Sequence, residues 1–442
     1  MYLLLALYVM KFSTDVLLIA PAVMGLIFSV SRIWDAISDP LVGYLSDRTS
    51  TSLGRRRTWI LVSFVPIALG FYAVFAPPQG LSVDALSWWM AAAVIGFYSA
   101  MTLFFVPHMA LGAELSNDYH ERSRLFGLRH AFYTIGSIVS LATMYLLLNE
   151  EFRDGGDVRS MAQEYALYAV IVMSVLVLYA VVNLRERPEF QGRLTSSPLS
   201  AFRDVWQNPH ARLLVVVTFI ENVGSSAIAV LTLYVTQYVV GAPLSAPLII
   251  LAYMLPSTAS VPMWLPLSRR FGKIRVWIFG MALYGVAFGG MFFLPFLDTV
   301  DARLALIIAM AAFAGFAAGC GGTIGPSVQG DVIDYDEYKT GERKEGSYFA
   351  AWNFVHKSAL GVMLLLTGFV LDFAGFMPNV EQTMQVKIAM VSLYGLFPLV
   401  CYTVGAILFS RFSLDEKAYE VIRTELNARR AKAAEEADAI GQ

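Results

Sequence analysis

Charged residues are scarce in this chain of 442 residues, and hydrophobic residues make up 57% of it. Asp, Glu, Lys and Arg together make up 15%, whereas soluble domains carry about a quarter. The chain has no dense basic tract, so we expect no nucleic acid partner. Its two cysteines, Cys320 and Cys401, lie in apolar segments and are expected to be buried thiols rather than a disulfide.

Catalytic signatures are also missing. We find no nucleotide-binding loop, no metal-ligand cluster and no nucleophile–base motif in the sequence. We therefore expect that the protein is not an enzyme and needs no cofactor.

Hydrophobic runs long enough to cross about 30 Å of hydrocarbon recur along the whole chain. Complete membrane spans are expected at residues 19–47, 57–77, 87–113, 124–148, 164–184, 212–240, 244–266, 274–295, 302–330, 347–374 and 387–411. Residues 1–15 would form a twelfth span, which covers only about 22 Å at about 1.5 Å per residue. We expect this first helix to be truncated.

Lysine and arginine gather in alternate loops. The basic loops lie near residues 48–57, 122–124, 185–203, 269–275 and 339–344. The loops at 77–87 and 241–247 contain no lysine or arginine. By the positive-inside rule the basic loops face the cytoplasm, so both termini are expected there.

The longest interior loop, residues 185–211, divides the spans into two groups of six. LSDRTSTSLGRRR in the first group is echoed by LSRRFGKIR at the equivalent place in the second. Two parallel halves of six helices, with substrate bound between them, characterise the major facilitator fold. We therefore expect an all-α membrane protein with an N-terminal bundle (1–184), a cytoplasmic linker (185–211), a C-terminal bundle (212–411) and a cytoplasmic tail (412–442) that begins as a polar helix.

Two carboxylates, Asp35 and Asp39, lie inside an apolar span and, being four residues apart, share one helix face. Ionisable groups at bilayer depth cost several kcal/mol unless they are paired, hydrated or bound to an ion. Pro40 cannot donate a hydrogen bond and so frees the carbonyl of Ala36 between the two acids. Oxygen ligands of this kind suit a cation. The alternative is a kinked helix in which Asp35 pairs with Arg32.

RIWDAISDPLVGYLSDRT, GRRRTWIL and GDVIDYDEYKTGERKEGSYFAAWNFVHKSALG resemble motifs of the glycoside-pentoside-hexuronide:cation symporters, the family of the melibiose permease. The resemblance runs through the whole chain, with its two long motifs in the right order. It implies a twelve-helix symporter that uses a Na+, H+ or Li+ gradient to accumulate a solute, usually a sugar or glycoside. It also implies that Asp35, Asp39 and Thr102 form the cation site, with Lys357 near it.

Lys357 is the natural counter-charge for such a site. Its ammonium group could balance the acids after the ion has left, so we assign Lys357 and Arg32 to coupling. A lysine that snorkels to the cytoplasmic interface is the alternative.

The motif GYLSDRT…GRRR is interpreted as a cytoplasmic gate. Asp47, Arg48, Arg55 and Arg56 could form ion pairs across the cytoplasmic side when the carrier faces outward. Exposed pairs of small net energy suit contacts that must break in every cycle. The alternative is that the arginines only fix the topology.

The substrate site resembles the family less closely. Of the residues that recognise sugar in the melibiose permease, the resemblance leaves only the arginine, as Arg129. Phe105 and Met109 stand where that protein has an aspartate and a tryptophan, and the glycine run around Gly322 replaces a second tryptophan. Losing a carboxylate argues against a simple galactoside and favours a roomier, more apolar pocket. Close helix packing is the alternative for the glycines, and an interfacial anchor is the alternative for Arg129.

Four further polar residues are candidates for substrate contact. Glu221 and Asn222 could hydrogen-bond sugar hydroxyls, or Glu221 could carry a proton. Asn353 and His356 lie one helical turn apart and could line the pocket, although single histidines are more often structural.

We therefore expect a secondary active transporter that couples Na+ or H+ to the uptake of a sugar, glycoside or related small solute. A lysolipid or other amphipathic solute is the alternative cargo, because related animal symporters with the same acids carry lysophospholipids. A membrane sensor without transport is the least favoured class. The protein is expected to be a monomer in a bacterial cytoplasmic membrane, and to bind lipid, solute and a monovalent cation.

Overall fold

The computed structural model describes residues 2–114, 119–184, 186, 203, 205–341, 345–414 and 418–428. Within these ranges, the side chains of some residues are not described, and only the backbone is given at residues 2, 36, 47, 110, 112–114, 119–131, 345–347 and 350. The regular structure of the described part is helical throughout, with no β-strand.

The helices of the first half are long and joined by short loops. They are α1 (Tyr2–Lys11) with its π-helical continuation η1 (Phe12–Val16), α2 (Pro21–Arg48), α3 (Arg55–Phe75), α4 (Val83–Glu114), α5 (Tyr119–Glu151) and α6 (Val158–Asn183).

The second half has the same build with more interruptions. Its elements are α8 (Pro209–Tyr234), η3 (Val235–Val240), η4 (Pro243–Ser245), α9 (Ala246–Ala259), α10 (Val261–Phe271), α11 (Lys273–Met291), η5 (Leu294–Phe296), α12 (Val300–Thr340), α13 (Glu345–Phe373), α14 (Met384–Val391), η6 (Ser392–Leu396) and α15 (Phe397–Phe409).

The helix inventory confirms the expected membrane fold. Nine helices of the described part are long and apolar enough to span a membrane, and the bent pair α9–α10 makes a tenth. Helix α2, with 28 residues, is long enough to span but carries several charged residues. The short α1 with η1 precedes α2 and completes the twelve expected helical segments.

One expected span is not a single straight helix. The segment expected at 244–266 is bent by 46° between α9 and α10. Pro262 lies in the first turn of α10 and cannot donate the hydrogen bond that a continuous helix would need there. The hydroxyl of Ser260 at the bend donates instead to the Phe316 carbonyl of α12, at 3.0 Å.

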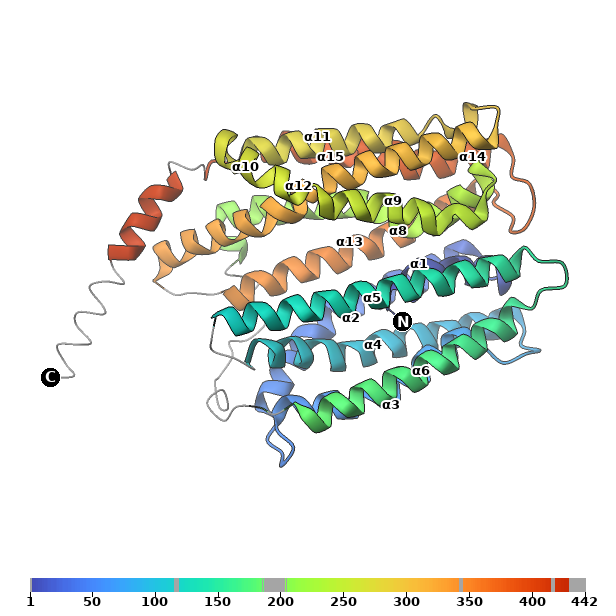
Figure 1. Ribbon diagram of the computed structural model, residues 1–442, viewed down its shortest axis with the longest axis horizontal. Helices are drawn as coiled ribbons and strands as arrows, with labels where there is room; N and C mark the ends of the chain where they lie inside the picture. The colour runs from blue at the N-terminus through green and yellow to red at the C-terminus, as the bar shows by residue number, and fades with distance from the viewer. Residues whose placement is uncertain are drawn as a thin grey trace.

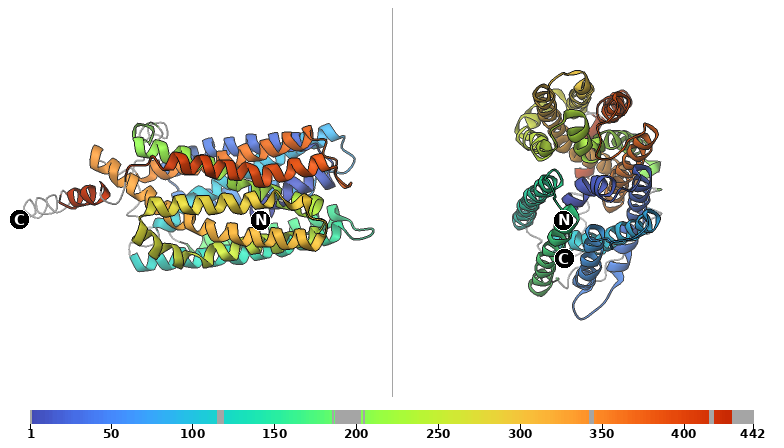
Figure 2. Two further views of the ribbon diagram at one scale, coloured as in Figure 1. Left: turned by 90° about the horizontal axis from the view of Figure 1, so that it is seen from above. Right: turned by 90° about the vertical axis from the view of Figure 1, so that its right-hand side faces the viewer.

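The helices form two bundles, one from each half of the chain (Figure 1). Helix α4 packs against α2 and α3 in the first, while α12 packs against α9 and α11 in the second. Viewed end-on, the two groups lie side by side (Figure 2). The predicted linker at 185–211 falls mostly outside the described residues, so the domain boundaries stay a prediction.

Helices α2 and α13 form the main contact between the bundles. Glycines make their crossing close: a Cβ atom at Gly25 would lie 2.7 Å from the Leu364 carbonyl oxygen, and one at Gly368 would lie 2.5 Å from that of Pro21. Because this crossing involves the start of α2 and the end of α13, it lies at the end of the molecule away from the basic loops.

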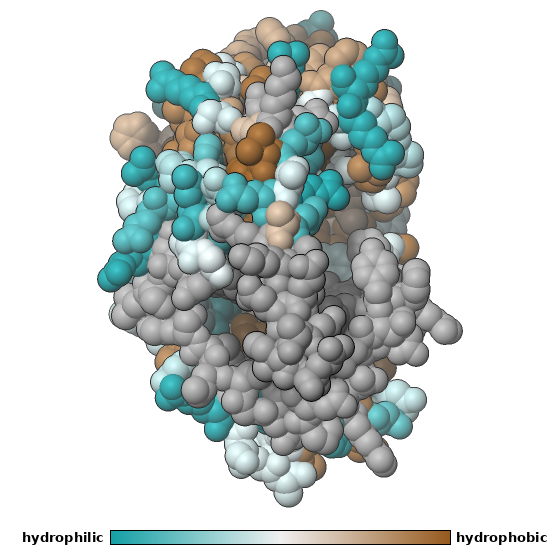
Figure 3. All heavy atoms as spheres, turned by 90° about the vertical axis from the view of Figure 1, so that its left-hand side faces the viewer, coloured by the Kyte–Doolittle hydropathy of each residue, from teal (hydrophilic) through white to brown (hydrophobic). Residues whose placement is uncertain are grey.

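The loop between α2 and α3, the α10–α11 junction and the helical residues 418–428 all lie at the opposite end of the molecule, on the left in Figure 1. Hydrophilic side chains are prominent in the coloured part of this end (Figure 3). Residues 418–428 are helical, in agreement with a tail that begins as a helix. The rest of the predicted tail, after residue 428, lies outside the described residues.

Candidate cation and substrate site

Three helices bring the predicted cation-site residues together. Thr102 on α4 donates its hydroxyl to Asp39 Oδ1 at 2.9 Å. Lys357 on α13 contacts Asp39 Oδ2 at 2.5 Å and Asp35 Oδ2 at 3.7 Å. The two acids of α2 therefore share one ammonium group from the other bundle. Lys357 points toward them rather than toward the interface.

Arg32 completes the charge balance around Asp35. Its Nη1 lies 3.3 Å from Asp35 Oδ2, and its Cζ lies 3.5 Å from the centre of the Tyr98 ring, which suits a cation–π contact. Among the described residues, Asp35 Oδ1 is buried without a hydrogen-bond partner. The Arg32–Asp35 pair considered as an alternative thus coexists with the Lys357 contact, and one oxygen of Asp35 remains available as a ligand.

The two acids differ in their access to water. The side chain of Asp39 is 21% exposed and that of Lys357 is 22% exposed, whereas that of Asp35 is 4% exposed. Asp39 is therefore the acid of the pair that water reaches more readily.

A hydrogen bond connects this site to α8. His356, next to Lys357, lies with its Nδ1 at 2.7 Å from Asn222 Oδ1. Because an amide oxygen only accepts, His356 carries a proton on Nδ1 in this arrangement. Two of the predicted substrate residues, Asn222 and His356, are therefore partners beside the predicted cation site.

Glu221 faces a cavity of about 300 Å³ inside the second bundle. Trp277 Nε1 on α11 donates to Glu221 Oε1 at 3.2 Å. The cavity is also lined by Asn222 and by the glycine run, through Gly321 and Gly322. A Cβ atom at Gly322 would meet nothing within 4 Å.

The glycines of the run differ in their surroundings. Gly322 borders open space, but a Cβ at Gly319 would overlap the Ser260 hydroxyl oxygen. Gly319 therefore permits close packing of α12 on the α9–α10 bend, while Gly322 leaves room in the cavity.

The remaining substrate candidates are less well placed. Phe105 on α4 is 50% exposed, and Met109 lies one turn further along the same helix. Asn353 is exposed on α13. Arg129 belongs to α5, but its side chain lies outside the described residues. None of these four has a described contact with Glu221 or Asp39.

The predicted cytoplasmic gate shows contacts within the first bundle. The backbone N–H groups of Arg55 and Arg56, at the start of α3, donate to the Glu186 carboxylate at 2.9 and 2.7 Å. Arg56 Nη1 also donates to Ser46 at 2.7 Å. An acid at a helix N-terminus is favourable. Gly54 permits this arrangement of Glu186 for two reasons. The φ angle of Gly54 is +108°, which is strained for other residues, and a Cβ atom added there would lie 2.6 Å from Glu186.

The other gate residues add little to this picture. Arg48 is exposed, and its guanidinium lies 4.0 Å from the Tyr44 ring centre on the same helix. The Asp47 side chain lies outside the described residues. The cross-bundle gate at this end therefore stays a prediction.

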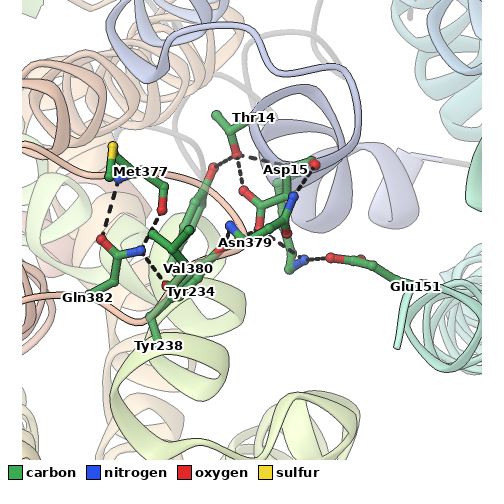
Figure 4. Close-up of polar contacts among 10 residues, drawn as sticks. Thr14, Asp15, Glu151, Tyr234, Tyr238, Met377, Asn379, Val380 and Gln382 are labelled. Atoms are coloured by element: carbon green, nitrogen blue, oxygen red, sulfur yellow. Dashed lines mark hydrogen bonds and ion pairs between the residues drawn. The ribbon is translucent and has the colours of Figure 1, made fainter. Parts of the chain in front are cut away.

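A second charged cluster, which we did not predict, lies at the opposite end (Figure 4). Lys11 forms ion pairs with Asp15, at 3.2 Å, and with Glu151. Asp15 also accepts a hydrogen bond of 2.6 Å from the Tyr238 hydroxyl of the other bundle. We name Lys11, Asp15, Glu151 and Tyr238 the distal cluster, because it lies away from the basic loops.

Further hydrogen bonds beside the distal cluster link the first bundle to the second. The hydroxyls of Thr14 and Tyr234 lie 2.8 Å apart. Asn379, in the loop after α13, donates its side-chain N–H to the Asp15 carbonyl at 2.7 Å and its backbone N–H to the Tyr238 hydroxyl at 3.1 Å. The two bundles are thus joined at this end through buried polar groups.

Two bundles of six helices, with charged groups where they meet, define a transporter of the major facilitator type. Solved structures of this type are similar: the nucleoside transporter NupG has a TM-score of 0.64 at 11% identity, covering 93% of this chain and 96% of that one. The tetrameric PepTSo2 has a TM-score of 0.65 at 13% identity, covering 92% and 94%. At this identity the likeness shows the fold alone.

Similar sequences indicate which family of major facilitator transporters this chain belongs to. The family model of the MFS/sugar transport proteins matches residues 1–416. The inner membrane symporter YicJ of Escherichia coli (strain K12) is 27% identical, over 92% of this chain and 86% of YicJ. The sodium-dependent lysophosphatidylcholine symporter 1 of Homo sapiens is 25% identical, over 94% and 80%. The chain belongs to the MFS/sugar transport family, and the resemblance to its cation symporters is confirmed.

Proposed function

We propose that the protein is a Na+-coupled symporter whose ion binds between Asp35, Asp39 and Thr102. The contact of Lys357 with both aspartates carries this proposal. Two carboxylates and a hydroxyl are the hard oxygen ligands that such a cation prefers, and one carboxylate oxygen, Asp35 Oδ1, has no hydrogen-bond partner among the described residues.

The charge balance of the site explains coupling. Asp35 and Asp39 are neutralised by Arg32 and Lys357, so the ion-free site carries no net charge. A cation that enters between the acids displaces Lys357, and an excess positive charge in this setting is costly. The displaced ammonium leaves the acids free to hold the ion, and it can return only after the ion has gone. Na+ and Lys357 thus exclude each other, which limits leakage of the empty carrier.

Alternating access follows from the contacts between the bundles. The α2–α13 glycine crossing and the distal cluster hold the bundles together at one end. Under the positive-inside rule that end faces outward, so this conformation is closed to the outside. Solute and ion would leave toward the cytoplasm of a bacterial cell, whose inner membrane is the proposed location, with both termini inside and the protein acting as a monomer.

The solute is proposed to bind near Asn222, His356 and Glu221. A sugar or glycoside agrees with the family, and a lysolipid agrees with the sodium-dependent lysophosphatidylcholine symporters among the relatives. Both would use the cavity beside the ion site, one for hydroxyls and the other for a headgroup.

Uptake into proteoliposomes tests this function. Glycosides and lysolipids would be supplied under an imposed Na+ gradient, an imposed pH gradient or neither. We expect accumulation driven by Na+, with no accumulation in liposomes that carry Asp39→Asn protein. Accumulation driven by the pH gradient alone would replace Na+ by H+. A protein that binds solute without accumulating it under any gradient would be a sensor instead.

A further inference from the structure

Glu221 is a buried carboxylate that pairs with no cationic side chain in the described part of the chain. It is 8% exposed, and its one described hydrogen bond comes from Trp277. By contrast, Lys357 serves both Asp35 and Asp39. A buried carboxylate without a counter-charge costs several kcal/mol. The positive charge that Glu221 lacks must therefore arrive from outside, as a proton or with a ligand.

Aromatic rings surround the cavity that Glu221 faces. Trp277, Tyr253, Tyr284 and Tyr402 line it together with the carboxylate. The hydroxyls of Tyr253 and Tyr284 lie 3.0 Å apart, which holds these two rings in fixed positions. The electron-rich faces of such rings attract cations, and groups of aromatic residues recognise quaternary ammonium ions.

The size of the cavity limits what it can hold. Its volume of about 300 Å³ lies at the small end of ligand pockets. Gly325 helps to keep it open, since a Cβ there would lie 3.5 Å from the Trp277 ring. A headgroup or a small amine fits a space of this size better than a whole lipid does.

We propose that this cavity binds the substituted ammonium group of the transported solute, with Glu221 as its counter-charge. This rests on the proposed function, because it assigns a substrate class to the same transporter. A neutral sugar would bring no positive charge to Glu221. A cationic or zwitterionic solute supplies the charge and places its methylated nitrogen against the rings of Trp277 and Tyr253.

The position of the cavity connects this group to the ion site. Asn222 follows Glu221 in α8 and also lines the cavity. Its side chain is hydrogen-bonded to His356, the neighbour of Lys357. A solute in this cavity that contacts Asn222 is therefore linked to Lys357 through one hydrogen bond and one peptide unit.

Calorimetric titration of the full-length protein in lipid nanodiscs, in saturating NaCl, tests the proposal. The probes are choline and its uncharged carbon analogue 3,3-dimethylbutan-1-ol. We expect choline to bind the unaltered protein at least tenfold more tightly than the analogue. Glu221→Gln should weaken choline binding at least tenfold, and Glu221→Asp should retain part of it. Glu164→Gln, the same change at an exposed site on α6, should have no effect.

Three results would overturn the proposal: no choline binding, equal binding of choline and its analogue, or unchanged choline binding by Glu221→Gln. The Na+-induced rise in melting temperature, measured on each variant, shows that the ion site is still folded. The proposal and the proposed function fail separately. Na+-driven glycoside uptake without choline binding would remove only the ammonium site, whereas Glu221-dependent choline binding without accumulation would remove only symport.

Discussion

Two lysines of this protein each lie between two carboxylates, but in opposite surroundings. Lys357 contacts Asp35 and Asp39 between the bundles and is 22% exposed. Lys11 contacts Asp15 and Glu151 and is 1% exposed. Both groups contain two acids, but only one of the two lysines can be reached by water. We infer that exposure decides whether such a cluster exchanges an ion or holds two parts of the protein together.

Charge balance separates the two clusters as well. Arg32 brings the Lys357 site to neutrality, since its Nη1 lies 3.3 Å from Asp35. In the distal cluster the second acid is satisfied by hydroxyl groups, among them that of Tyr238 at 2.6 Å from Asp15. In the proposed mechanism the Lys357 site releases its lysine to a cation, whereas the distal cluster would have to be pulled apart as a whole.

The largest effect is expected from Lys357→Ala. Without the ammonium group the ion-free site holds an uncompensated acid, and the empty carrier can no longer complete its cycle. We expect the Na+-driven accumulation ratio in proteoliposomes to fall to the passive value of about one.

One control accompanies this variant. Lys387→Ala removes a lysine of α14 whose partner Glu381 is 91% exposed, and it should leave uptake unchanged. Concentrative uptake by Lys357→Ala protein at the level of the unaltered protein would contradict the coupling role of this lysine.

The next largest effect is expected from Lys11→Met, on stability rather than coupling. Removing the cation leaves Asp15 and Glu151 buried without it, and breaking a buried ion pair in this way costs about 3–5 kcal/mol. The measurement is the free energy of unfolding in detergent micelles.

The double variant Lys11→Met/Glu151→Gln is the matched control for this loss. It removes a charge of each sign. Its loss of unfolding free energy should therefore be smaller, by at least about 0.5 kcal/mol, than the summed losses of the two single variants. Strict additivity would show that Lys11 and Glu151 do not interact.

The two clusters also differ in how far they could be predicted. Asp35 and Asp39 were found because they lie in the middle of an apolar span, where acids are rare, and Thr102 and Lys357 followed from the family resemblance. Lys11 and Glu151 lie near the ends of spans. Charged residues are common there, so their presence does not predict a buried ion pair. The side chains of these two residues are joined across 140 positions of the chain, and only the packing of α1 against α5 reveals the contact.

Other parts of the site were missed for similar reasons. Glu186 lies between Arg185 and Arg187 in a basic linker, so its role as an acceptor for the start of α3 was hidden by the surrounding charge. The sequence of the glycine run is compatible with close helix packing and with an open pocket. Only the neighbours of Gly319 and Gly322 in the structure show which glycine permits packing and which borders open space. The spans themselves were predictable, because hydrophobic length is a property of each segment alone.

Tyr238→Phe is expected to have a smaller, conformational effect. The change removes the hydroxyl that joins the bundles at Asp15, and a hydrogen bond to a charged group contributes about 1.5–3 kcal/mol. The population open at the distal end should rise about 10- to 150-fold, measured by spin-label distances between the loops at 77–82 and 241–245. Tyr72→Phe, which loses a 2.8 Å bond to Gln163 within the first bundle, should not change these distances.

The smallest effect is expected from Arg153→Ala, which tests whether exposure is the variable that matters. Arg153 pairs with Glu150 at 3.4 Å, beside Glu151 in sequence, but its side chain is 70% exposed. Water already solvates the Arg153 guanidinium, so losing the pair should change the free energy of unfolding by less than about 1 kcal/mol. A loss as large as that of Lys11→Met would mean that position at this end of the protein, rather than burial, sets the strength of its ion pairs.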